Sequence, residues 1–275
     1  MLDSLQHICL MHGMEVDYYK KLFQTIGNIL DLIEKDDMPK YLLFLENAFP
    51  YMDNYNYHKG MKEIIQELKV LLKTKSIGTD SDRALLLDFQ AALETQPEKA
   101  IKLEKNALAQ IENITADNAR LVSNLHANLG GLYRMNGYPD LAREHMEKSI
   151  SLLDQFNLLH INDSIPQIAN YAMFLTKQQE PERGISKLQK LSGIIKEYHS
   201  DECLDYAKVQ ENLATIYLMT ANLSQAKTHF KKAFKIYEKI LADEPEMIEA
   251  KYREIQELYP QIGFSIGKTL SGLLT

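Results

Sequence analysis

The chain has 275 residues, of which 45% are hydrophobic and 25% charged, and it carries a formal net charge of −7. A negative net charge disfavours nucleic-acid binding, because phosphate recognition depends on concentrated lysine and arginine. Its two cysteines, Cys9 and Cys203, are too few for a disulfide framework or a thiolate metal site. No stretch reaches the roughly 18 consecutive apolar residues of a membrane span, and the N-terminus lacks the pattern of a signal peptide. Composition therefore predicts a cytoplasmic protein that binds neither nucleic acid nor membrane.

Apolar residues recur with the 3.6-residue period of helices nearly throughout, and no run alternates as a strand would. Turn signals predict helices at residues 3–12, 15–35, 38–54, 57–75, 80–95, 97–113, 117–136, 139–157, 162–179, 181–199, 202–221, 223–242 and 245–258. The tyrosine-rich segment 51–57 is interpreted as a turn, and the apolar tail 264–274 as a terminal helix or a docking segment. The expected fold class is all-α.

Several residue types repeat along the chain at a spacing of 42 residues. The repeated positions are Leu87, Leu129, Tyr171 and Leu213, then Pro97, Pro139 and Pro181, and then Ala100, Ala142, Gly184 and Ala226. A fixed period in this range is typical of a solenoid, in which each unit buries its apolar face against its neighbours. We therefore expect a divergent helical region at 1–79, four repeats at 80–242 and C-terminal capping helices at 243–275.

Each repeat is expected to contain two helices joined by an encoded turn. Asn136 and Gly137 tolerate a left-handed backbone and close a first helix, and Pro139 opens the second. In the last repeat Leu223 replaces the proline, and Asn222 supplies the cap instead. Two registers of small residues predict close helix crossings, at Gly130, Ala172 and Ala214 and at Ala100, Ala142, Gly184 and Ala226.

These residues resemble the tetratricopeptide repeat family. The run 129–133, Leu-Gly-Gly-Leu-Tyr, matches the family pattern of the first helix, and Ala226, Phe230 and Ala233 match that of the second. The resemblance covers residues 117–242 and extends to 80–116, where Asp88 and Glu104 depart from the pattern. It implies a right-handed α-solenoid of stacked antiparallel helix pairs.

The repeats are about eight residues longer than the common 34-residue unit, which is about one more turn on each helix. Repeats of this length look like those of kinesin light chains and of bacterial sensor regulators, including peptide-pheromone receptors. The resemblance implies a non-catalytic module that binds an extended peptide or protein segment in a concave groove, without a cofactor. The alternatives are the regulatory domain of a bacterial peptide-responsive regulator, and a homodimer formed through the solenoid ends.

One polar register suggests where such a ligand would bind. Asn128, Asn170 and Asn212 lie 42 residues apart, although asparagine is a poor residue in the middle of a helix. The family resemblance places them in the groove, where each amide would hydrogen bond a ligand backbone. The neighbouring registers vary between repeats and are candidates for specificity: Asn124, Arg134, Met173, Lys177, Lys208, Glu211 and Thr215. The alternative is that the asparagines are inherited from one ancestral repeat, or tie helices together.

Other sites are not supported by the sequence. The carboxylate clamp of the family is incomplete, because Ala127 stands where a lysine is expected. The eight histidines are scattered and form no metal or catalytic motif, and no glycine-rich phosphate loop is present. We therefore expect no enzymatic activity, no cofactor and no metal.

Overall fold

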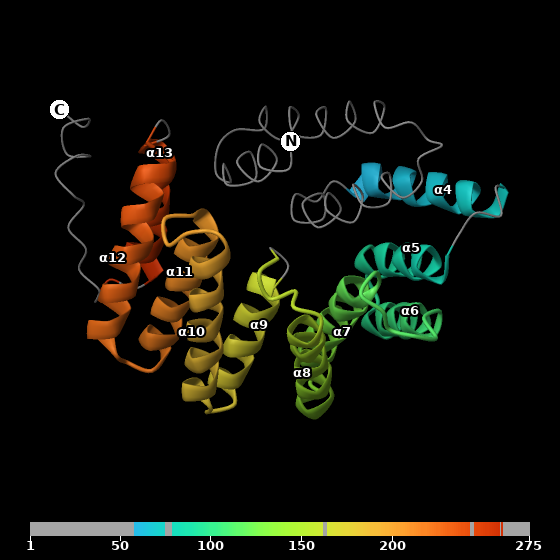
Figure 1. The fold of residues 1–275 in the computed structure, drawn as a ribbon, viewed down its shortest axis with the longest axis horizontal. Helices are drawn as coiled ribbons and strands as arrows, with labels where there is room; N and C mark the ends of the chain where they lie inside the picture. Colours follow the sequence, from blue (N-terminus) through green and yellow to red (C-terminus); the bar gives the residue numbers. More distant parts are fainter. Residues whose placement is uncertain (1–57, 75–78, 162–163, 243–244, 259, 261–275) are drawn as a thin grey trace. The chain divides into compact units, whose positions relative to one another are not determined.

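The computed structural model describes residues 58–74, 79–161, 164–242, 245–258 and 260 (Figure 1). These residues form helices and no strand, which confirms the all-α prediction for this part of the chain. The helices are α4 (His58–Thr74), α5 (Asp80–Ala92), α6 (Pro97–Ala109), α7 (Ala119–Met135), α8 (Pro139–Gln155), α9 (Ser164–Lys177), α10 (Pro181–Tyr198), α11 (Leu204–Met219), α12 (Leu223–Ile240) and α13 (Pro245–Leu258). The helices expected at 3–12, 15–35 and 38–54, segment 51–57 and tail 264–274 lie outside the described residues.

The second helices of successive pairs begin at Pro97, Pro139, Pro181 and Leu223, at the turns that the sequence predicts. Proline suits the first position of a helix, because its fixed φ matches the helix and its missing N–H has no intrahelical partner there. Helix α12 has no such proline and is capped by Asn222 instead, whose side chain accepts a hydrogen bond from the backbone N–H of Gln225 at 3.2 Å. The turn chemistry predicted at this helix start is therefore confirmed.

Two helix ends differ from the expectation by more than two residues. Helix α5 ends at Ala92 and not at 95, and α6 ends at Ala109 and not at 113. After α6, the Asn118 side chain accepts a hydrogen bond from the backbone N–H of Thr115 and donates one to the carbonyl of Asn113. These side-chain bonds satisfy backbone groups in a turn that competes with further helix.

The chain divides into two compact units, residues 1–149 and 150–275. In the first unit α5 packs against α4, α6 and α7, so that the neighbouring first helices α5 and α7 touch. The second unit repeats this arrangement, because α11 contacts α9, α10 and α12. Helix α8 crosses the division. Within the described residues, no helix combines the length and the apolar character needed to cross a membrane.

Small residues lie where helices cross closely, as the sequence predicts. A Cβ atom added to Gly130 would lie 2.6 Å from Cγ of Met146, and one added to Gly184 would lie 2.7 Å from the carbonyl oxygen of Ala172. Ala226 is fully buried beside Phe230 in the core of the second unit. The alternation of small and large residues therefore lets the helix backbones approach closely while the core stays filled.

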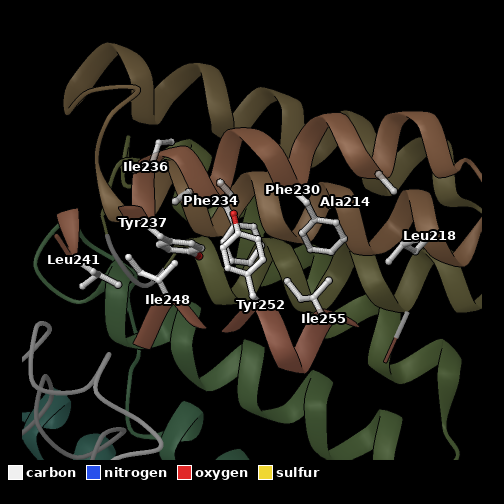
Figure 2. Packing of buried hydrophobic residues seen from close by; sticks show 13 residues of the cluster. Ala214, Leu218, Phe230, Phe234, Ile236, Tyr237, Leu241, Ile248, Tyr252 and Ile255 are labelled. Carbon is white, nitrogen blue, oxygen red and sulfur yellow. The ribbon is translucent and has the colours of Figure 1, made fainter. Parts of the chain in front are cut away.

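The last helix closes the second unit with an aromatic core (Figure 2). Ile248, Tyr252 and Ile255 of α13 pack on the apolar residues of α11 and α12. The ring of Tyr252 stacks on that of Phe234 with 3.9 Å between centroids. Helix α13 thus covers the apolar face that α12 would otherwise expose, which is the role of a terminal cap in a repeat protein.

Candidate functional site

The three repeated asparagines lie on the first helices α7, α9 and α11. Asn128 and Asn170 are exposed, and Asn212 is half-exposed. The seven neighbouring candidates are also accessible: Arg134 and Lys177 are exposed, whereas Asn124, Met173, Lys208, Glu211 and Thr215 are half-exposed. Since α9 contacts α11, Asn170 and Asn212 lie on adjacent helices of one unit. All ten candidates are therefore on the surface and accessible to a ligand.

Two of the asparagine amides already donate hydrogen bonds. The Nδ2 of Asn212 donates to the carbonyl oxygen of Lys208, one turn earlier on α11, at 2.9 Å. The Nδ2 of Asn128 donates to Oδ1 of Asp88 on the neighbouring first helix α5, at 2.8 Å. Asn128 thus ties two repeats together, which is the structural role that the sequence left open beside ligand binding.

Glu211 also has a structural partner. Its Oε2 accepts a hydrogen bond of 2.6 Å from the hydroxyl of Tyr237, which lies on α12. Burial, together with the adjacent Glu211 carboxylate, raises the pKa of Tyr237 well above its usual value. The Thr215 hydroxyl donates within its own helix, to the carbonyl oxygen of Glu211 at 3.0 Å. Glu211 therefore anchors α11 to α12.

The polar residues that depart from the repeat pattern come together in the first unit. Glu104 is buried, with 2% of its surface exposed, and forms a side-chain hydrogen bond with half-buried Asp88. Burial raises the pKa of both carboxyl groups, and the repulsion from Asp88 raises that of Glu104 further. Sequence reasoning noted the two departures separately, but it did not pair the residues or join them to Asn128.

Two polar pairs that the sequence did not identify join the first and second helices of a repeat. The Nδ1 atoms of His126 on α7 and His145 on α8 lie 2.8 Å apart. Eighty-four residues later, at the same register, Oε1 of Gln210 and Nδ1 of His229 lie 2.8 Å apart. Their shared spacing of 19 residues was the signal that could have found them.

Both pairs disfavour a charged imidazole. Burial lowers the pKa of His126 to about 4, with further contributions from His145 and Lys148. Burial is also the main cause of the lowered pKa values of His145 and His229. The ring of Tyr133 packs near His145, with 5.4 Å between centroids. These groups therefore act as neutral hydrogen-bonding ties between helices.

Within the described residues, no three histidine, cysteine, aspartate or glutamate side chains come together as metal ligands do. The polar groups of the ten candidates are amides, a hydroxyl, cations and one carboxylate, that of Glu211, which accepts from Tyr237.

Comparisons with known proteins agree with this geometry. The tetratricopeptide repeat family matches residues 164–239, which cover α9 to α12. No curated protein matches the chain.

Solved structures extend the likeness over more of the fold. BtubC (BKLC) from P. vanneervenii is 19% identical with a TM-score of 0.53, and the match covers 66% of this chain and 72% of that one. A putative kinesin light chain from Podosopora anserina with nearly identical TPR-like repeats is 14% identical with a TM-score of 0.54, covering 72% and 96%. The apo form of RapI is 13% identical with a TM-score of 0.51, covering 92% and 70%. Residues 164–239 therefore match the tetratricopeptide repeat family, and the chain shares the helical-repeat fold of its structural neighbours.

Proposed function

We propose that this helical-repeat scaffold binds an extended peptide or protein segment along the accessible face of its first helices. The observation that carries the proposal is the repetition of an accessible asparagine on α7, α9 and α11. A side-chain amide has both a donor and an acceptor, so it can bond to the N–H and C=O of an extended backbone. The amides of Asn170 and Asn212, on the adjacent helices α9 and α11, would therefore hold a peptide largely independently of its side chains.

The residues that vary beside the asparagines would select the sequence of the ligand. Lys177 and Arg134 present exposed positive charge, whereas Met173 presents a half-exposed apolar side chain. A charged contact and an apolar contact would discriminate between peptides of equal length. Acting as a sensor for such a peptide is the finer form of the same proposal.

The proposal is tested with a pool of acetylated, amidated hexapeptides randomised at every position and retained on the immobilised full-length chain. Asn170→Ala and Asn212→Ala should each weaken retention by about 2- to 12-fold, which corresponds to one lost neutral hydrogen bond. Folding should be nearly unchanged, because alanine has the better helix propensity.

Asn106→Ala is the matched control, because Asn106 is an exposed helical asparagine on the second helix α6. Its retention of the pool should equal that of the wild type. Lower melting temperatures for Asn170→Ala and Asn212→Ala with unchanged retention would contradict the proposal and assign the asparagines to folding alone.

A further inference from the structure

The first repeat carries two acids where the others carry an apolar pair. Asp88 takes the register of Gly130, Ala172 and Ala214, and Glu104 takes that of Met146, Leu188 and Phe230. The closeness of Gly130 to Met146 shows that these two registers face each other across a helix pair. Apolar residues fill this seam without any polar group that needs a partner, whereas buried carboxyl groups cost desolvation energy. Packing alone therefore does not account for the acids.

The two acids and Asn128 form a cluster that runs from the surface into the core. Asn128 is exposed, Asp88 is half-buried and Glu104 is buried. Asn128 donates to Oδ1 of Asp88, and Asp88 shares a hydrogen bond with Glu104. The Oε2 atom of Glu104 is buried, and no geometric hydrogen-bond partner lies beside it. An acceptor left in this state is costly unless a donor reaches it in another state of the protein.

The cluster contains two acids and an amide, and no base. A hydrogen bond between two carboxyl groups requires that one of them keeps its proton, and burial raises the pKa of both. The groups that act on the two pKa values from α5, α6 and α7 are the partner carboxyl and the Asn128 amide, and no described basic side chain is among them. Burial therefore disfavours ionisation of both carboxyl groups, and no described base offsets this effect.

We infer that the cluster of Asp88, Glu104 and Asn128 receives one basic side chain of the bound peptide, a lysine ammonium or an arginine guanidinium. The inference rests on the proposed function, since Asn128 belongs to the asparagine register. The cation passes Asn128 and donates hydrogen bonds to Asp88 and to Oε2 of Glu104. A cation at this place favours the ionised forms of both acids, so that any proton they hold leaves to solvent. Binding of the basic residue therefore strengthens as pH rises.

A double variant, Asp88→Gly with Glu104→Met, isolates the cluster because it copies Gly130 and Met146 of the next repeat. It is compared with the wild type on two hexapeptide pools that differ at one fixed position, lysine or norleucine. The wild type should retain the lysine pool about tenfold more tightly, the effect of one charge-assisted hydrogen bond, and the double variant should retain both equally. Equal retention of the two pools by the wild type would overturn the inference while leaving the proposed function standing.

A second measurement needs no peptide. n-Butylammonium chloride should raise the melting temperature of the wild type above that in tetramethylammonium chloride of equal concentration, because only the first cation has N–H donors. The difference should be larger at pH 7 than at pH 5 and absent from the double variant. Glu104→Gln, which keeps the side-chain volume but cannot ionise, should also reduce it. The same difference in all three proteins, or a larger shift of the wild type alone in calcium chloride, would contradict the assignment to a basic side chain.

Discussion

Two glycines of helix α10 have different roles, although both lie in its interior. A Cβ on Gly184 would meet the carbonyl oxygen of Ala172 at 2.7 Å, and backbone cannot move aside as the end of a side chain can. Gly193 has nothing within 4 Å of the same added atom. Gly184 therefore permits the close approach of α9 and α10, whereas Gly193 only weakens the helix.

We expect Gly184→Ala to lower the free energy of unfolding by about 1–3 kcal/mol, because the methyl group overpacks the seam. Gly193→Ala is the matched control and should raise it by about 0.5–1 kcal/mol, since alanine is the better helix former. Urea unfolding of the two variants measures both. Stabilisation by both substitutions would mean that the seam at Gly184 is wider than 2.7 Å.

At the scale of single residues, the sequence predicts the packing positions that recur in every repeat. Gly184 was identifiable because Ala100, Ala142 and Ala226 share its register. The bond from Asn128 to Asp88 was not, because it joins first helices of neighbouring repeats, and its partner occupies a position that is apolar in the other repeats. A repeat pattern reveals packing positions that recur along the chain. A contact made by a residue that departs from the pattern can be seen only in three dimensions.

The ends of the first helices also show that a sequence pattern reveals only part of the structure, here at the scale of elements. The residues after α7, α9 and α11 that adopt a left-handed backbone are Gly137, Gln179 and Ala221, with φ values of 78°, 64° and 58°. They lie 42 residues apart, so the backbone repeats even where the glycine does not. The sequence predicted this conformation at Asn136 and Gly137; Gly137 adopts it, whereas Asn136 has a φ of −94°. Gln179 and Ala221 were missed, because glutamine and alanine carry no signal for it.

We expect Ala221→Gly to raise the free energy of unfolding by about 0.5–1 kcal/mol, because glycine avoids the steric cost of a left-handed Cβ. The gain is reduced by the greater freedom of glycine in the unfolded chain. Ala250→Gly makes the same substitution at an exposed position inside α13, where it should cost about 1 kcal/mol. Thermal unfolding of both variants provides the measurement, and equal losses would show that residue 221 is unstrained.

The stability of the whole molecule should depend on pH in two opposite ways. The pKa of His126 is about 4 in the folded chain, below its usual value of 6.5, so folding favours the neutral ring. Its contribution is complete above pH 6.5 and is lost as pH falls through 4. The pKa values of Asp88 and Glu104 are raised, so folding favours their protonated forms. Their contribution is complete below the usual carboxyl range and is lost as pH rises.

The acidic side of this profile is tested with His126→Gln, which copies Gln210 of the last repeat. In the last repeat Oε1 of Gln210 accepts a hydrogen bond from Nδ1 of His229, and a glutamine at position 126 can accept from Nδ1 of His145 in the same way, yet it does not titrate. The loss of unfolding free energy between pH 7 and pH 5 should be smaller in the variant, by on the order of 1 kcal/mol after allowance for solvent screening. An unchanged loss would show that the groups around the pair, Glu144, Lys148 and Lys105, compensate for its protonation.

The alkaline side is tested with Asp88→Gly combined with Glu104→Met. Replacing buried carboxyl groups by a packed apolar pair removes their desolvation cost and should raise the free energy of unfolding by about 1–4 kcal/mol at neutral pH. The gain should grow between pH 5 and pH 8, because ionisation of the acids weakens only the wild type in that interval. Chemical unfolding at pH 5, 6.5 and 8 measures the gain, with His126→Gln as a control whose difference from the wild type lies on the acidic side. A gain that is independent of pH would mean that both carboxyl groups ionise in the folded chain as they do in the unfolded one. Greater stability of the double variant together with loss of its preference for lysine peptides would indicate that the first repeat keeps its acids for the ligand, at the expense of its own stability.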